Sequence, residues 1–127
     1  MEIWLIDDDN LTNLLNGMVI ADFDSLFIVR EFDAAEHAIN ELRNGQCPDI
    51  IFLDINMPVM DGWGFLDELD TISSIQTRKP FISVLTSSLA YEDKDRALKS
   101  KWVNKFIIKP LSRQLIVQVL EANANEQ

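Results

Sequence analysis

The sequence predicts a doubly wound α/β fold, in which five parallel strands form one sheet and five helices cover its two faces. Short apolar runs of strand length alternate with segments whose apolar residues recur at helical spacing. The apolar runs lack the polar alternation of half-exposed strands, so both faces of the sheet should be buried. Strands of this kind are joined by right-handed helical crossovers, which produce a parallel sheet.

The length of 127 residues fits one domain, and we expect residues 1–127 to form it. No apolar run approaches the roughly 20 residues of a membrane-spanning helix, and no basic region precedes an apolar stretch at the N-terminus. We therefore expect a cytoplasmic protein. The net charge of -10 repels nucleic acid phosphates and anionic lipids, so neither direct nucleic acid binding nor membrane binding is expected.

The first half of the chain predicts three strands and two helices. Residues 3–6 form a strand that stops at an Asp triplet, and residues 26–29 and 50–53 form the next two strands. In the first helix, one face carries apolar residues at positions i, i+3, i+4 and i+7, with Asp9 or Asn10 as the N-cap: Leu11, Leu14, Leu15 and Met18. Asp33 and Glu36 resemble a capping box that opens the second helix, which ends at Gly45.

The second half predicts three helices and two strands. A helix begins near Gly62, and a strand covers residues 81–85 and stops at residues 86–88. The segment 91–100 reads as a helix with a thin apolar stripe, of which Ala97 and Leu98 are the clearest members, so its packing should be weak. Residues 106–108 form a short fifth strand, and Ser112 can cap the last helix.

Polar residues follow the strands where each one ends. Ligands of doubly wound sheets bind outside the carboxyl ends of the strands, so these side chains should converge on one edge of the sheet: Asp7, Asp8, Asp54, Thr86 and Lys109. Clustered carboxylates repel one another without a cation, and hard oxygen ligands suit Mg2+. A carboxylate flanked by a metal, a hydroxyl and an ammonium can act as a nucleophile toward a phosphoryl group.

Four motifs in order resemble the receiver domains of two-component response regulators. They are residues 5–8, residues 52–58 with Asp61 and Gly62, residues 85–87, and residues 106–110. The resemblance implies a flavodoxin-like fold of strand order 2-1-3-4-5 and a signalling domain rather than an enzyme. Asp54 would be the phosphoacceptor. Asp8, Asp54 and the backbone carbonyl of Asn56 would bind Mg2+, with Asp7 acting through water.

The resemblance also assigns the remaining site residues. Thr86 and Lys109 would contact the phosphoryl group, and the peptide bond between Lys109 and Pro110 would be cis. Thr86 would move toward the phosphoryl group and let Phe106 turn inward. The phosphodonor would be a histidine kinase or a histidine phosphotransfer protein. A downstream protein would bind the fourth helix, fifth strand and fifth helix. The resemblance also leaves open a homodimer that forms on phosphorylation.

Two other functions stay open at this point. A degenerate receiver would serve as a constitutive interaction module, although every chemical position is filled here. A phosphatase of the haloacid dehalogenase type also uses a strand-end Asp and Mg2+, but it carries a second Asp two residues later, where this chain has Asn56. A calcium loop of the EF-hand type is excluded because Val59 stands at the position of its required Gly.

Overall fold

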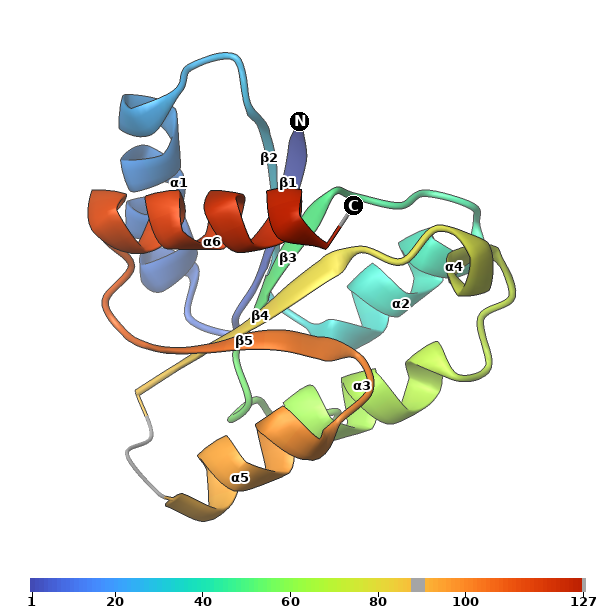
Figure 1. Cartoon of the computed structure of the whole chain (residues 1–127). Helices are drawn as coiled ribbons and strands as arrows, with labels where there is room; N and C mark the ends of the chain where they lie inside the picture. The colour runs from blue at the N-terminus through green and yellow to red at the C-terminus, as the bar shows by residue number, and fades with distance from the viewer. Residues whose placement is uncertain (88–90, 127) are drawn as a thin grey trace.

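The apolar runs form a five-stranded parallel sheet at the centre of the computed structural model, which describes residues 1–87 and 91–126 (Figure 1). The strands are β1 (Glu2–Ile6), β2 (Ile28–Phe32), β3 (Ile50–Leu53), β4 (Phe81–Thr86) and β5 (Val103–Ile108). Their order is β2-β1-β3-β4-β5, which confirms the predicted topology. All four residues of β3 and all six of β4 are buried, as continuous apolar strands require.

Helices cover both faces of the sheet (Figure 1). They are α1 (Asn10–Phe23), α2 (Ala35–Arg43), α3 (Gly62–Leu69), α4 (Ser74–Thr77), α5 (Tyr91–Lys99) and α6 (Arg113–Asn125). One core cluster joins the sheet to α1 and α6 through Ile20, Ile116 and Val119. A second cluster joins the opposite face to α2 and α3 through residues such as Leu42 and Phe65. The result is a three-layer sandwich.

The described residues contain six helices, one more than predicted. The extra helix, α4, is a single turn without a side-chain cap, and it is anchored by the fully buried Ile75. One turn is too short to show helical periodicity, which explains why the sequence pattern missed it. The helix predicted over residues 91–100 is therefore α5, and the last predicted helix is α6.

The apolar face of α1 that the leucine spacing predicted does not pack on the sheet. Leu11, Leu14, Leu15 and Met18 are between 51% and 61% exposed, whereas Asn13, Asn16 and Ile20 are buried. The helix begins as expected, because the Asp9 carboxylate accepts hydrogen bonds from the backbone N–H groups of Leu11 and Thr12. Its polar, small face lies on the sheet because Gly17 allows close approach there, with Leu5 and Glu31 near the position of a Cβ atom.

Three further expectations need correction. The second strand begins at Ile28 rather than at Leu26, because its pairing with β1 starts where Ile28 lies opposite Glu2 and ends where Phe32 lies opposite Ile6. Leu26 lies outside this pairing and is 84% exposed. Asp33 does not cap α2, whose N-cap is Ala34 without a side-chain hydrogen bond. Leu98 is 58% exposed, so Ala97 is the single buried residue of α5. This confirms that α5 is thinly anchored.

Two loop geometries shape the approach to α3. Val59 adopts a φ of 66°, a left-handed conformation that is costly for a β-branched side chain, and it is 97% exposed. Gly62 packs so tightly that a Cβ atom would lie 2.7 Å from the carbonyl oxygen of Asp54. The loop after β3 is therefore compressed against the strand end that carries Asp54.

Candidate functional site

Three carboxylates meet at the carboxyl ends of β1 and β3. The possible ligand atoms of Asp7, Asp8 and Asp54 all lie within 4.8 Å of one another. Asp7 and Asp54 are buried, and Asp8 is exposed. The strand pairing explains the convergence, because β1 and β3 are adjacent and the Asp54 N–H donates to the carbonyl oxygen of Ile6.

Lys109 reaches this cluster from the end of β5. Its Nζ lies 2.6 Å from Oδ2 of Asp7 and 3.6 Å from Oδ1 of Asp54. The other oxygen of Asp7 accepts a hydrogen bond from the backbone N–H of Asp9. The lysine therefore supplies one positive charge to the cluster, on the side where β5 ends.

Burial and the charges at the site together shift two pKa values. Burial, followed by the neighbouring Asp7 carboxylate, raises the pKa of Asp54 to about 6, against the opposing effect of Lys109. For Lys109, burial lowers the pKa, but the hydrogen bond to Asp7 and the charge of Asp54 outweigh burial and raise the pKa above its ordinary value. The ammonium is thus held in its charged form beside a carboxylate whose ionisation is unfavourable.

Thr86 and the peptide after Lys109 complete this edge of the sheet. Thr86 is the last residue of β4 and is fully buried, and its carbonyl oxygen accepts a hydrogen bond from the Lys109 N–H. The bond between Lys109 and Pro110 is cis. Asn56 lies two residues beyond Asp54 with an exposed side chain. The fourth strand was expected to stop at residues 86–88, and β4 ends at Thr86; residue 88 lies outside the described residues.

A small core cluster connects this edge to α5. It contains Ile55, directly after Asp54, together with Val84 of β4 and Ala97 of α5. Phe106 and Trp63 are partly buried against it. Phe106, the residue expected to act as a switch, therefore packs against the same group of side chains as the loop after β3 and the thinly anchored helix α5.

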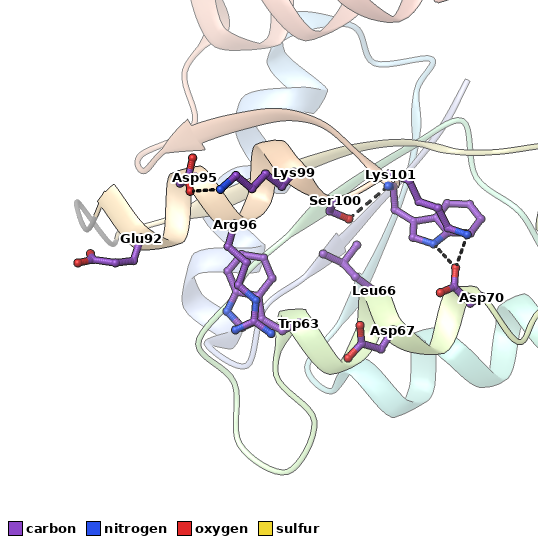
Figure 2. Close-up of a pocket in the computed structure, with 11 residues that line it drawn as sticks. Trp63, Leu66, Asp67, Asp70, Glu92, Asp95, Arg96, Lys99, Ser100 and Lys101 are labelled. Atoms are coloured by element: carbon purple, nitrogen blue, oxygen red, sulfur yellow. Dashed lines mark hydrogen bonds and ion pairs between the residues drawn. The ribbon is translucent and has the colours of Figure 1, made fainter.

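A groove of about 600 Å3 lies between α3 and α5, and Figure 2 shows its lining. The Arg96 guanidinium lies over the Trp63 ring at 4.4 Å, which ties α5 to α3. Asp70 accepts one hydrogen bond from the Trp102 indole N–H and forms an ion pair with Lys101. None of the predicted site residues lines this groove, so it is separate from the acidic cluster.

Sequence reasoning missed two residues beneath the site. Asn13 and Asn16 of α1 are buried and line a small cavity together with Asp7 and Asp54. A usable signal was present, because Asn13, Asn16, Gly17 and Ile20 also fall at helical spacing on one face. Two faces of α1 therefore show helical spacing, one of polar and small residues and one of leucines. Hydrophobicity favours burial of the leucine face, whereas the polar and small face lies on the sheet.

Fold and site together define a doubly wound α/β domain of the flavodoxin-like type with an acidic pocket at the carboxyl ends of its strands. A profile of the response regulator receiver domain matches residues 3–121. The chain belongs to this family, whose members are signalling modules.

Individual relatives agree with this assignment. The chain is 31% identical over 121 residues to a protein-glutamate methylesterase/protein-glutamine glutaminase of Syntrophomonas wolfei. The alignment covers 94% of this chain and 32% of the relative. The chain therefore spans about a third of the length of that relative. Among solved structures, a two component response regulator from Cytophaga hutchinsonii superimposes with a TM-score of 0.88 at 30% identity, covering 98% of this chain and 96% of the other.

A second solved structure shows the same fold at lower identity. The response regulator receiver protein of Dyadobacter fermentans has a TM-score of 0.86 at 22% identity, with 98% of each chain covered.

No helix in residues 1–87 and 91–126 is long and apolar enough to cross a membrane.

Proposed function

We propose that this domain accepts a phosphoryl group on Asp54 in a Mg2+-dependent reaction and changes its protein-binding surface in response. The observation that carries the proposal is the cluster of Asp7, Asp8 and Asp54 within 4.8 Å, with the Lys109 ammonium 3.6 Å from Asp54. A phosphoryl group brought to this point would meet a nucleophilic oxygen, a cation site and a fixed positive charge. These are the groups that phosphoryl transfer to a carboxylate requires.

The donor set fits Mg2+. One possible ligand oxygen from each of the three carboxylates lies within 4.8 Å of the others, so hard oxygen donors of the kind that Mg2+ prefers are gathered at one point. Asp8, Asp54 and the Asn56 backbone carbonyl would hold the ion, with Asp7 as the water-linked group. The ion would neutralise charge on the phosphoryl oxygens.

Asp54 is the proposed nucleophile. One of its carboxylate oxygens forms a bond to phosphorus while the bond from phosphorus to the donor breaks, and that electron pair leaves with the donor. For a phosphohistidine donor the broken bond is P–N and the leaving group is the imidazole. Lys109 and Thr86 bind the transferred oxygens, which stabilises charge without any further proton transfer at Asp54.

The exposed leucine face of α1 supports a protein as the phosphodonor. Leu11, Leu14, Leu15 and Met18 form one apolar stripe that begins just after the Asp triplet. Single exposed apolar residues are ordinary, but four on one helical face mark an interaction surface. Beside the stripe, Leu15 and Val19 share a cavity of about 310 Å3 with residues 109–111, adjacent to the site. A histidine kinase or histidine phosphotransfer protein docked there would place its phosphohistidine near Asp54.

Phe106 and α5 form the proposed output. A shift of Thr86 toward the phosphoryl group would act on the shared cluster of Ile55, Val84 and Ala97, against which Phe106 packs. Phe106 has no hydroxyl, so it can report by packing but not through a hydrogen bond. The surface of α5, β5 and α6 would then bind a downstream protein or a second phosphorylated copy in the cytoplasm.

Beryllofluoride, a mimic of a bound phosphoryl group, tests this proposal by NMR titration in the presence of Mg2+. We expect resonance shifts around Asp54, at Phe106 and along α5. The Asp54→Asn variant should show none of these shifts. Asp49→Asn is a matched control, because Asp49 directly precedes the opposite end of β3. Unchanged spectra in the unmodified protein would remove the switching function and favour a constitutive interaction module.

A further inference from the structure

The inner face of α1 carries a buried amide next to the acidic cluster. Asn13 is 1% exposed, and it lies between the helix and the sheet, where apolar side chains are the rule. A buried amide is unfavourable unless hydrogen bonds replace those it made to water. The hydrogen bonds of Asn13 should therefore indicate what this buried amide stabilises.

The amide nitrogen of Asn13 joins the ends of two strands. Its Nδ2 donates to the carbonyl oxygen of Asp7 at 2.9 Å and to that of Phe32 at 3.1 Å. The Phe32 carbonyl also accepts from the backbone N–H of Asp7 at 3.0 Å. The backbone of Asp7 is thus held by β2 and by α1 at the point where its carboxylate enters the site.

The amide oxygen of Asn13 has no hydrogen-bond partner among residues 1–87 and 91–126. Asn13 lines a cavity of about 10 Å3, together with Asn16, Asp7 and Asp54. This space is close to the ~10–15 Å3 that one water molecule needs, and polar cavities of this kind hold ordered water. A water there would have the Asn13 oxygen as an acceptor and the carboxylates of the site within the same cavity.

We propose that Asn13 is a positioning residue of the phosphoacceptor site. Its nitrogen fixes the backbone of Asp7, and its oxygen accepts a hydrogen bond from one water molecule buried beneath Asp7 and Asp54. This inference rests on the proposed function, because it assigns Asn13 to the Mg2+ site described above. Groups that orient metal ligands from behind typically contribute a factor of about 10–100 in metal affinity.

Substitution of Asn13 by Leu tests the positioning role. Leu has nearly the same shape, and it removes both donated hydrogen bonds and the acceptor oxygen that faces the cavity. We expect the Asn13→Leu variant to bind Mg2+ about 10-fold or more weakly, measured by NMR titration on protein whose folding is confirmed by circular dichroism. A merely structural residue would lower the stability of the variant but leave the Mg2+ affinity of the folded protein unchanged, and that result would overturn the proposal.

Ser83→Ala provides a matched control. Ser83 Oγ is the other buried side-chain oxygen without a partner in the described part of the chain, and it lies on β4 outside the site. Its removal should leave the Mg2+ affinity unchanged. An equal loss in Ser83→Ala and Asn13→Leu would show a general effect of core substitution and would contradict the specific role of Asn13.

A high-resolution crystal structure of the unmodified protein decides the water site independently, including the case in which Asn13→Leu fails to fold. An ordered water within hydrogen-bond distance of Asn13 Oδ1 supports the inference, and an empty cavity overturns it. If the unmodified protein does not bind Mg2+ at all, the proposed function and the positioning role that depends on it both fail. If it binds Mg2+ and Asn13→Leu binds it equally well, only the role of Asn13 fails.

Discussion

The Nζ of Lys109 lies 2.6 Å from Oδ2 of Asp7, although 102 positions separate the two residues in the sequence. The pair joins the ends of β1 and β5, which are not neighbours in the sheet. Lys109 therefore holds together the two sides of the acidic edge. It also balances charge that Asp7 and Asp54 would otherwise leave uncompensated.

Removal of this ammonium should destabilise the protein. In a chelator at about pH 8, Lys109→Met should lower the free energy of unfolding by about 1.5–3 kcal/mol, as expected for a hydrogen bond between charged groups. Lys99→Met is the control, because Lys99 forms an exposed pair with Asp95 that solvent screens, so its removal should change the stability much less. Urea denaturation measures both, and equal losses would contradict a special role for Lys109.

Replacement of Asp54 by Asn should stabilise the metal-free protein in a pH-dependent way. The pKa of Asp54 is about 6 in the folded protein and about 3.8 in the unfolded chain, so folding favours the protonated form. Ionised Asp54 thus lowers stability above about pH 6, and this penalty disappears as the pH falls toward 3.8.

The gain in stability of Asp54→Asn should accordingly be full at about pH 8 and shrink below about pH 6. Denaturation in chelator across this range measures it. A gain for Asp54→Asn that grows on acidification would contradict the assigned cause.

Substitution by alanine should change the stability in opposite directions at Gly62 and Gly64, two glycines of the first turn of α3. A Cβ at Gly62 would lie 2.7 Å from the Asp54 carbonyl oxygen and 2.8 Å from the Ile55 Cα, so the backbone must shift. Gly62→Ala should cost about 1–3 kcal/mol and weaken Mg2+ binding.

Gly64 is the matched position. A Cβ there would meet the flexible Met60 side chain at 3.1 Å, and alanine has a higher helix propensity by about 1 kcal/mol. Gly64→Ala should therefore be neutral or stabilising, with unchanged Mg2+ binding. Thermal unfolding and Mg2+ titration of both variants compare them, and similar losses would contradict the close approach at Gly62.

The left-handed backbone at Val59 should be a source of strain. Val59→Gly should stabilise the protein by about 1 kcal/mol or more, because glycine adopts a φ of 66° without the steric cost that valine pays there. The side chain is 97% exposed, so its loss removes little packing. Val117→Gly on α6 is a contrasting control that should destabilise. A loss of stability in Val59→Gly would contradict the strain.

The sequence predicted the elements whose environment is apolar on all sides. Residues 50–53 form β3 as expected, and the position of Asp54 at its end followed directly. Edge and surface elements were less predictable. The edge strand β2 is partly exposed to solvent and contains the charged residues Arg30 and Glu31. The apolar run at residues 26–29 therefore did not mark where this strand begins and ends.

The orientation of α1 could not be predicted from hydrophobicity. Its leucines show helical spacing, but contacts between distant segments decide which face is buried. Asn13 lies inward because the carbonyl oxygens of Asp7 and Phe32 accept its hydrogen bonds, and Gly17 lies inward because β1 and β2 approach closely. Those partners are set by strand pairing, which a local pattern does not contain.

Mass spectrometry of the protein incubated with acetyl phosphate is the sharpest test of phosphorylation at Asp54. The unmodified protein should gain the mass of one phosphoryl group only when Mg2+ is present, and peptide mapping should locate the group on Asp54. Asp54→Asn should gain nothing under the same conditions, whereas Asp49→Asn should behave like the unmodified protein. Phosphorylation of Asp54→Asn, or no gain of mass by the unmodified protein with Mg2+, would show that Asp54 is not the phosphoacceptor.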